Sequence, residues 1–229
     1  MNTTRILVFD LDDTLFPERA FVRSGFQAVS DWIEHDQGVS GFFDIAWQLF
    51  LSGKRHLVFD QTLDYLNFNY SPALIQHLVQ IYRNHEPLIS LHEDAAWALS
   101  HFQNRLKLGL ITNGYLRTQQ TKVRRLGIES YFDALIYCDR YGLEYWKPSP
   151  RGFQDLMTMM ACEGHECVYV GDHPYKDFVA PKQLGWQTVR IQRDGGEFAT
   201  VVADPALGAE HTIRSLYDLQ ALLAVAVSP

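Results

Sequence analysis

Short apolar runs recur along this chain, and their spacing limits its fold more than any other feature does. Five runs are continuously apolar rather than alternating, which is typical of strands covered on both faces. Helical patterns separate the runs, so their order predicts an α/β fold with a Rossmann-like parallel sheet wrapped by helices. The predicted strands, including a weaker sixth, cover residues 6–9, 107–112, 134–137, 167–171, 186–191 and 211–213. The predicted helices of this part cover residues 93–105, 115–126, 149–162, 174–184 and 215–225.

The interval at residues 17–87 interrupts this order, because it contains helical patterns and no convincing strand. Segments such as FFDIAWQLFL and ALIQHLVQIY carry apolar residues three and four positions apart. We therefore expect an α-helical cap domain at 17–87, inserted into an α/β catalytic core domain formed by residues 1–16 and 88–229. Within the core, Ser149-Pro150 predicts a helix start, with the serine as cap and the proline at the first helical position.

The composition is that of a globular protein, since 47% of its 229 residues are hydrophobic and can form a sizeable core. Acidic residues outnumber basic ones by 27 to 20, which gives a formal net charge of −7. This balance argues against a nucleic-acid or anionic-membrane partner, because both usually require a basic surface. The sequence shows no signal-peptide pattern and no apolar run of membrane-spanning length. The three cysteines have no spacing typical of a disulfide framework, so we expect a cytoplasmic protein. The sequence leaves the oligomeric state open.

Three aspartates, Asp10, Asp12 and Asp13, follow the first predicted strand within four positions. Taken alone, they fit an acidic turn about as well as a working site. Polar residues also follow the other strands, however, and the carboxyl ends of parallel strands meet at one edge of a sheet, where ligands bind. These residues are Thr112, Asn113, Lys147, Asp172 and Asp177. We therefore expect acids, a hydroxyl and a lysine to converge at one place.

The charges of this set favour a metal ion together with an anionic substrate. Four of the aspartates would repel one another, and one lysine offsets only part of their charge. A divalent cation would neutralise two further charges. Carboxylate oxygens suit Mg²⁺, which keeps several waters and accepts substrate oxygens, whereas zinc would favour histidine or cysteine. The sequence therefore predicts a Mg²⁺ cofactor.

The order of these motifs resembles the haloacid dehalogenase-like (HAD) hydrolase superfamily. DLDDT, the threonine that ends the second strand, the lysine before a helix and GDHPYKD occur in that superfamily's order, over nearly the whole chain. The stretch IYCDRYGLEYWKPSPRGF is also typical. The chain looks most like the phosphatase branch with a helical cap inserted after the first motif. It departs from many relatives at His173 and at Val179-Ala180, which is followed by Pro181.

The resemblance implies roles for the first and fourth motifs. Asp10 would attack phosphorus and form an aspartyl phosphate, and Asp12 would act as general acid and then general base. Mg²⁺ would be held by Asp10, the main-chain carbonyl of Asp12 and Asp172. Asp177 would orient Lys147 or waters on the metal.

The second and third motifs would hold the phosphoryl group. The resemblance implies a hydrogen bond from the Thr112 hydroxyl, with help from main-chain N–H groups such as that of Asn113, and a positive charge from Lys147. Phe16 and Glu18, at the entry to the helical insert, are weaker candidates for substrate contact.

These roles predict a Mg²⁺-dependent phosphatase that hydrolyses a small phosphorylated metabolite, a phosphomonoester. Haloacid dehalogenases themselves lack the second acid of the first motif, so the presence of Asp12 favours phosphoryl transfer. A phosphomutase of the same superfamily is the nearest alternative, and a phosphate-binding or receiver-like module without turnover is a more distant one. The sequence leaves the identity of the phosphomonoester open.

Other motifs have simpler interpretations. We interpret Asp13 as a structural residue that caps the following turn. CEGHEC at 162–167 contains possible metal ligands but fits a helix-to-strand loop better. SGKRH at 52–56 could hold an anionic group, but an ordinary basic loop between helices is favoured.

Overall fold

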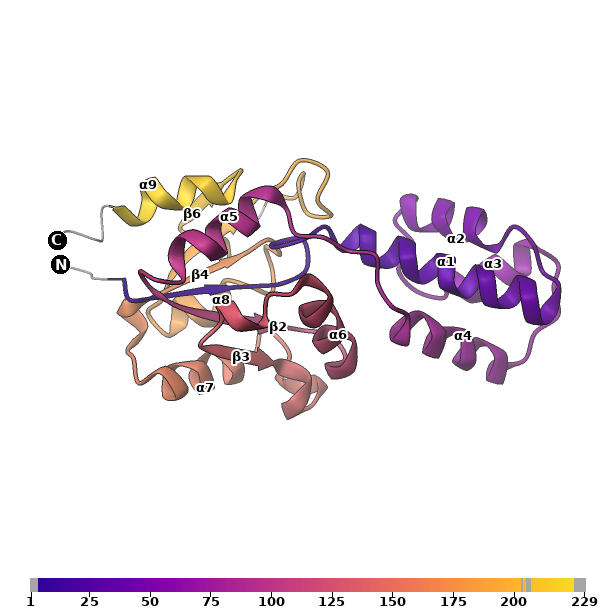
Figure 1. The fold of residues 1–229 in the computed structure, drawn as a ribbon, viewed down its shortest axis with the longest axis horizontal. Coiled ribbons are helices and arrows are strands. Elements are labelled where there is room, and N and C mark those ends of the chain that lie inside the picture. Colours follow the sequence, from indigo (N-terminus) through magenta and orange to yellow (C-terminus); the bar gives the residue numbers. More distant parts are fainter. Residues whose placement is uncertain (1–3, 203, 205–206, 225–229) are drawn as a thin grey trace. The chain divides into compact units, whose positions relative to one another are not determined.

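The fold is described by a computed structural model that covers residues 4–202, 204 and 207–224 (Figure 1). Its centre is a six-stranded sheet in the order β3-β2-β1-β4-β5-β6, and every neighbouring pair is parallel. The strands are β1 (Ile6–Phe9), β2 (Lys107–Thr112), β3 (Ala134–Tyr137), β4 (Cys167–Gly171), β5 (Gln187–Ile191) and β6 (His211–Ile213). The predicted α/β fold with a parallel sheet is therefore confirmed.

Helices cover both faces of this sheet, as Figure 1 shows for α5 and α9 on one side and α7 on the other. They are α5 (Glu93–Phe102), α6 (Leu116–Leu126), α7 (Arg151–Met160), α8 (Val179–Gln183) and α9 (Leu219–Ala224). Short 3₁₀ helices lie at Glu129–Tyr131, Cys138–Tyr141, Leu143–Tyr145, Gly164–Glu166 and Leu216–Asp218.

The strands are continuously apolar because both of their faces are covered. In β1, Ile6 and Val8 pack in one core cluster with Phe153 and Leu156 of α7. Side chains alternate along a strand, so Leu7 and Phe9 lie on the opposite face, and both are fully buried. Because neighbouring strands are all parallel, the residues that follow each strand lie at one edge of the sheet.

Two predicted helices begin later than the sequence indicates. α7 begins at Arg151, with Pro150 at the capping position rather than the first helical position, and Ser149 accepts only a long 3.4 Å hydrogen bond from the Arg151 N–H. α8 begins at Val179 instead of near residue 174. The reason is that the preceding turn folds back, so that the Asp177 carboxylate accepts a hydrogen bond from the His173 N–H.

The interval between β1 and α5 is helical, with α1 (Glu18–Gln37), α2 (Phe42–Leu51), α3 (Val58–Tyr65) and α4 (Pro72–Asn84). Residues Glu18–Ile89 form one compact unit, and Met1–Pro17 with Ser90–Pro229 form the other. The helical unit has a core of its own, in which Phe26 contacts the rings of Phe50 and Phe59. That this unit acts as a cap stays a prediction.

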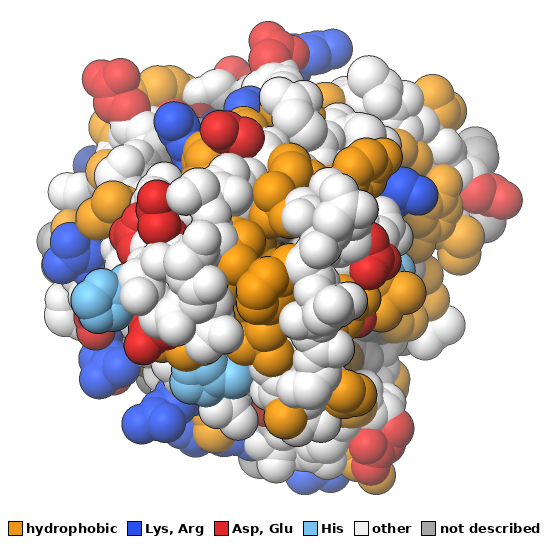
Figure 2. All heavy atoms as spheres, turned by 90° about the vertical axis from the view of Figure 1, so that its right-hand side faces the viewer, with side chains coloured by type: hydrophobic (Ala, Val, Ile, Leu, Met, Phe, Trp, Pro, Cys, Tyr) orange, Lys and Arg blue, Asp and Glu red, His pale blue; other side chains and the backbone are white. Residues whose placement is uncertain are grey.

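Apolar side chains also reach the molecular surface. On the face drawn in Figure 2, they gather between polar and charged groups. The large exposed apolar residues of the helical unit include Leu51, Leu57 and Tyr65. Among the described residues, no helix combines the length and apolar character that a bilayer crossing requires.

Candidate active site

Asp10 and Asp172 lie side by side because β1 and β4 are adjacent strands. Phe9 at the end of β1 is in register with Val170, and the Asp10 N–H donates to the Val170 carbonyl at 2.8 Å. After β1 the chain continues toward β2 on one side, and after β4 toward β5 on the other. This reversal is the position at which open α/β sheets bind ligands.

Lys147 joins two of the acids. Its Nζ lies 2.6 Å from Asp10 Oδ1, 2.8 Å from Asp177 Oδ1 and 2.9 Å from the Tyr169 hydroxyl. All four side chains are buried, so the three donors of the ammonium are used within the protein. The structure therefore brings Asp10, Lys147 and Asp177 together, as the sequence predicts, and adds a tyrosine that the sequence reasoning missed.

The electrostatics of this cluster favour a bound cation. Burial raises the pKa of Asp10 to about 7, with Lys147 opposing the rise and Asp177 adding to it. Burial, together with Asp177 and Asp10, also raises the pKa of Asp172 well above its usual value. Burial lowers the pKa of Lys147, but the negative charges of Asp10 and Asp177 outweigh this and raise it well above its usual value. One lysine therefore leaves the carboxylates only partly compensated.

The donor set fits a magnesium ion. Asp10, Asp172 and Asp177 each offer a carboxylate oxygen, and these oxygens lie within 4.8 Å of one another. Oxygen ligands of this kind are those that Mg²⁺ accepts. Asp177 already bonds Lys147 and Tyr169 through Oδ1 and the His173 N–H through Oδ2. Asp10 and Asp172 are therefore the better candidates for direct ligands.

Gly171 allows Asp177 to reach this position. A Cβ atom at Gly171 would lie 2.5 Å from Asp177 Oδ2, closer than real Cβ contacts occur. The glycine that precedes Asp172 in the fourth motif thus leaves room for the second acid of the same motif.

Asp12 lies apart from this cluster, against α6. Its Oδ1 is 2.6 Å from the Lys122 Nζ, and its Oδ2 accepts from the Gln119 Nε2 at 2.8 Å. The same Gln119 nitrogen lies 2.6 Å from the Thr112 hydroxyl oxygen. The sequence reasoning missed Gln119 and Lys122. Two long polar residues three positions apart, on the helix that follows the second motif, were the available signal.

The Asn113 side chain holds the main chain of the third motif. Its Nδ2 donates to the Lys147 carbonyl at 3.1 Å, and its Oδ1 accepts from the Lys147 N–H at 2.9 Å. This reciprocal pair fixes the main chain from which the lysine side chain extends. The predicted part of Asn113 in phosphate binding concerned only its main-chain N–H and stays a prediction.

The residues after Asp12 form a tight turn. Asp13 has a φ of +53°, a conformation that aspartate tolerates better than most residues, which agrees with a structural role. Phe16 is fully buried, and the Lys122 Nζ lies 5.8 Å from its ring centroid. Glu18 begins α1. Substrate contact by Phe16 or Glu18 stays a prediction.

Arg193, which sequence reasoning also missed, fastens this turn to the rest of the core. Its guanidinium donates to the Thr14 carbonyl at 2.8 and 3.2 Å and forms a two-bonded ion pair with Asp94, at 3.0 Å for each bond. Burial tends to raise the pKa of Asp94, but hydrogen bonds from Arg193 and the Leu216 N–H lower it overall. Arg193 lies two residues after the end of β5, and nothing in the sequence distinguishes it from other arginines of the chain.

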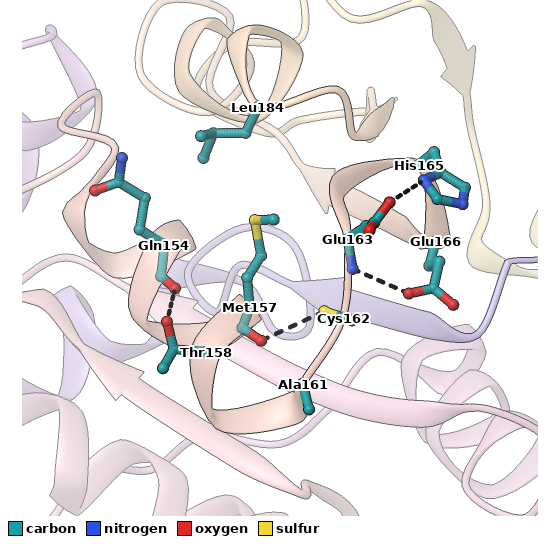
Figure 3. Close-up of a pocket in the computed structure, with 9 residues that line it drawn as sticks. All are labelled: Gln154, Met157, Thr158, Ala161, Cys162, Glu163, His165, Glu166 and Leu184. Carbon is teal, nitrogen blue, oxygen red and sulfur yellow. Dashed lines mark hydrogen bonds and ion pairs between the residues drawn. The ribbon is translucent and has the colours of Figure 1, made fainter.

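A large cavity lies at the opposite edge of the sheet, with a volume of about 820 Å³. Figure 3 shows its lining residues at the end of α7 and in the loop before β4. Glu163 and His165 form an ion pair there at 3.4 Å, and both side chains are largely exposed. Cys162 and Cys167 lie 3.5 Å apart as free thiols. CEGHEC lies between the end of α7 at Met160 and the start of β4 at Cys167, so it forms the helix-to-strand connection that the sequence predicts.

Comparisons with known proteins place this geometry in context. A family model described as haloacid dehalogenase-like hydrolase matches residues 4–185. A glyceraldehyde 3-phosphate phosphatase of Methanocaldococcus jannaschii is 32% identical over 225 residues, covering 93% of this chain and 94% of the relative. The crystal structure of a HAD phosphatase from Thermococcus onnurineus is similar at a TM-score of 0.64 and 25% identity, covering 96% of this chain and 98% of that one. A Bacillus subtilis protein, described as a HAD-hydrolase bound to magnesium, has a similar fold at a TM-score of 0.71 and 20% identity, covering 96% and 98% of the two chains.

Proposed function

This chain belongs to the haloacid dehalogenase-like hydrolase family, and we propose that it is a Mg²⁺-dependent phosphatase of small phosphomonoesters. The observation that carries the proposal is the buried contact of 2.6 Å between the Lys147 Nζ and Asp10 Oδ1 at the carboxyl-end edge of the sheet. A lysine held there would bring positive charge both to an attacking carboxylate and to a phosphoryl group that approaches it.

Asp10 would be the nucleophile. Its Oδ1 is held by Lys147, which leaves Oδ2 to attack phosphorus and form an aspartyl phosphate. The Thr112 hydroxyl accepts from Gln119 and donates to the Asn113 carbonyl at 3.2 Å, and we propose that it would exchange this long bond for one to a phosphoryl oxygen. Asp177 and Tyr169 would keep the Lys147 ammonium in place through their contacts of 2.8 and 2.9 Å.

Asp12 would serve the two proton transfers. As a general acid it would protonate the ester oxygen that leaves, and as a general base it would deprotonate the water that hydrolyses the aspartyl phosphate. Its side chain lies with Gln119 and Lys122 and not with the three acids that could hold a metal. Acid–base work and metal binding are thereby assigned to different carboxylates.

Asp10, Asp172 and the main-chain carbonyl of Asp12 would hold the metal. A bound Mg²⁺ would reduce the repulsion between the Asp10 carboxylate and an anionic phosphate. The carboxylate set of Asp10, Asp172 and Asp177 supports this assignment, because its oxygens lie close together and their charges are only partly offset by Lys147.

Glyceraldehyde 3-phosphate is the substrate that we propose to test first, because the Methanocaldococcus relative is described as its phosphatase. A small phosphorylated metabolite as the partner and a cytoplasmic location stay predictions at this point.

The test is phosphate release from a panel of phosphomonoesters that includes glyceraldehyde 3-phosphate, with Mg²⁺ or with a chelator. Wild type would be compared with Asp10→Asn and with Asp36→Asn, a matched change at an exposed aspartate of α1. We expect release that requires Mg²⁺, is lost in Asp10→Asn and is unchanged in Asp36→Asn. A folded wild type that hydrolyses no ester would contradict the proposal. If turnover required a sugar bisphosphate activator, the phosphomutase alternative would replace it.

A further inference from the structure

The Asp12 carboxylate is enclosed by two polar side chains of α6. Lys122 donates to Oδ1 at 2.6 Å and Gln119 donates to Oδ2 at 2.8 Å, so each carboxylate oxygen has its own donor. Gln119 is 1% exposed and Lys122 is 3% exposed, although both are long polar residues that normally face water. Polar groups lose hydration when they are buried, and these contacts offset that cost.

The sequence around α6 builds this arrangement from three features. Gln119 and Lys122 are three positions apart and therefore share one face of the helix. The Leu116 N–H, at the first residue of the helix, donates to Asp139 Oδ2 at 2.9 Å and fixes the start of the helix. Gly114 supplies the necessary space, because its φ is +118° and a Cβ there would lie 2.9 Å from the Gln119 Cδ.

Gln119 also connects Asp12 with the hydroxyl of the second motif. Its Nε2 lies 2.8 Å from Asp12 Oδ2 and 2.6 Å from Thr112 Oγ1. The Gln119 amide presents its NH₂ group to Asp12, and the same nitrogen also donates to the Thr112 hydroxyl oxygen. One side chain thus sets the positions of both groups.

We propose that Gln119 and Lys122 are positioning residues for Asp12, and that they hold its carboxylate in the orientation from which it serves the leaving ester oxygen. This inference rests on the phosphatase function proposed above. The competing interpretation is that the two residues only fasten α6 to the first-motif turn. That structural role would lower the activity toward every substrate by the same factor.

Leaving groups of different basicity separate the two interpretations. The alkoxide of an alkyl phosphate such as glycerol 3-phosphate needs a proton as it leaves, whereas the phenolate of p-nitrophenyl phosphate needs little help. The quantity to compare is kcat/KM, because it reports the steps up to phosphoryl transfer to Asp10 and not the later hydrolysis that both substrates share.

The variants are Lys122→Met and Gln119→Met, with Arg124→Met, an exposed change on the same helix, as control. For Lys122→Met we expect kcat/KM to fall about 10²-fold on glycerol 3-phosphate and less than about 10-fold on p-nitrophenyl phosphate. Gln119→Met should show the same selective loss with a smaller size, and Arg124→Met should match wild type. Equal losses on both esters would overturn the inference while leaving the phosphatase function intact.

A double-variant cycle with Asp12→Asn provides the second readout. If Lys122 acts through Asp12, adding Lys122→Met to Asp12→Asn should lower kcat/KM on glycerol 3-phosphate by less than about 2-fold. Additive losses would overturn the inference. If Lys122→Met does not fold, as judged by its melting curve, the cycle is run with Gln119→Met and decides in the same way. If the wild type does not hydrolyse glycerol 3-phosphate, an alkyl ester of the panel that it does hydrolyse takes its place, and a wild type that hydrolyses no ester of the panel would overturn the proposed function and this inference with it.

Discussion

At the carboxyl-end edge of the sheet, Lys147, Asp10 and Asp177 are buried and bonded to one another, whereas Arg5 and Lys107 at the amino-end edge are exposed. Arg5 forms an ion pair with Glu166 at 2.7 Å, in which the arginine side chain is 62% exposed and the glutamate side chain 14% exposed. The cavity of about 820 Å³ also lies at the amino-end edge. The buried charge cluster and this cavity therefore lie at opposite edges of the sheet.

This difference teaches that buried charge and cavity volume single out different parts of one fold, and that the residues of the sequence motifs lie with the buried charge. Charged groups are costly to remove from water, so a protein that buries several together must compensate them closely. Exposed ion pairs contribute little to stability and need no such environment. The following substitutions test the contrast between the edges, beginning with the largest expected effect.

Replacing Lys147 should be the most damaging change. Lys147→Met leaves Asp10 and Asp177 buried without their cation, and we expect a loss of about 3–5 kcal/mol in unfolding free energy. Activity should fall at least about 10²-fold, because the positive charge beside Asp10, the proposed nucleophile, is gone. Lys107→Met, at the exposed first residue of β2 on the amino-end edge, is the matched control and should change stability by less than about 0.5 kcal/mol. Urea unfolding and phosphate release measure both effects, and similar losses in the two variants would erase the contrast.

Arg193 offers a comparison of two arginine–carboxylate pairs. Arg193→Met breaks the buried pair with Asp94 and removes both donors to the Thr14 carbonyl. We therefore expect the unfolding free energy to fall by about 3 kcal/mol. Arg5→Met breaks the pair with Glu166, in which the arginine side chain is 62% exposed, and should lower the melting temperature much less than Arg193→Met. Calorimetry of the two variants is the measurement. A larger shift for Arg5→Met than for Arg193→Met would contradict this account.

Tyr169→Phe tests how much one neutral hydroxyl contributes within the buried cluster of Lys147, Asp10 and Asp177. The hydroxyl contacts the Lys147 Nζ at 2.9 Å and Asp177 Oδ1 at 3.2 Å. Its removal should cost about 1 kcal/mol of stability. If the same energy is lost in the transition state, kcat falls about fivefold. Steady-state kinetics and melting curves check the prediction, and an unchanged kcat would show that the tyrosine does not help to position the lysine.

His92 gives the smallest expected effect, through pH. Burial, with Arg193 adding and Asp94 opposing, lowers the pKa of His92 to about 4, from an ordinary value of 6.5. Between these two values the unfolded chain binds a proton that the folded chain does not, so stability should fall as pH drops from about 6.5 toward 4. Because His92 is partly exposed, we expect this group to lower the unfolding free energy by only about 1 kcal/mol over that pH range. Denaturant unfolding of wild type and His92→Gln across this range should give a shallower pH slope for the variant, and parallel slopes would exclude His92 as the cause.

Much of the fold could be predicted from sequence because strand burial leaves a direct pattern. Five of the six strands have the predicted bounds, and β5 begins one residue late, at Gln187. The family also followed from the order of the motifs, and the match over residues 4–185 confirms it. Helix starts were less predictable, since the start of α8 depends on the contact between Asp177 and the His173 N–H. The same carboxylate also bonds Lys147, which lies 30 positions earlier in the chain.

The candidate site could be predicted where a residue follows a strand directly. Asp10 and Asp172 are of this kind and Thr112 is the last residue of β2, so the parallel strands alone bring them to one edge. Tyr169, Gln119 and Arg193 were missed for a different reason, because each acts through a side chain that reaches across the fold. The Gln119 nitrogen, for example, reaches Asp12, 107 positions earlier in the chain. Only the packing of α6 against the first-motif turn reveals such a contact.

The central claim, that Asp10 is the nucleophile of a phosphatase, is tested most directly by looking for the phosphorylated enzyme. Wild type and Asp10→Asn would be mixed with glyceraldehyde 3-phosphate and Mg²⁺, quenched in acid within one turnover, digested, and analysed by mass spectrometry. The account predicts a phosphoryl group on Asp10, in the peptide from the wild type only. Phosphate release by the wild type with no phosphorylated peptide, or with the phosphoryl group on another residue, would contradict it.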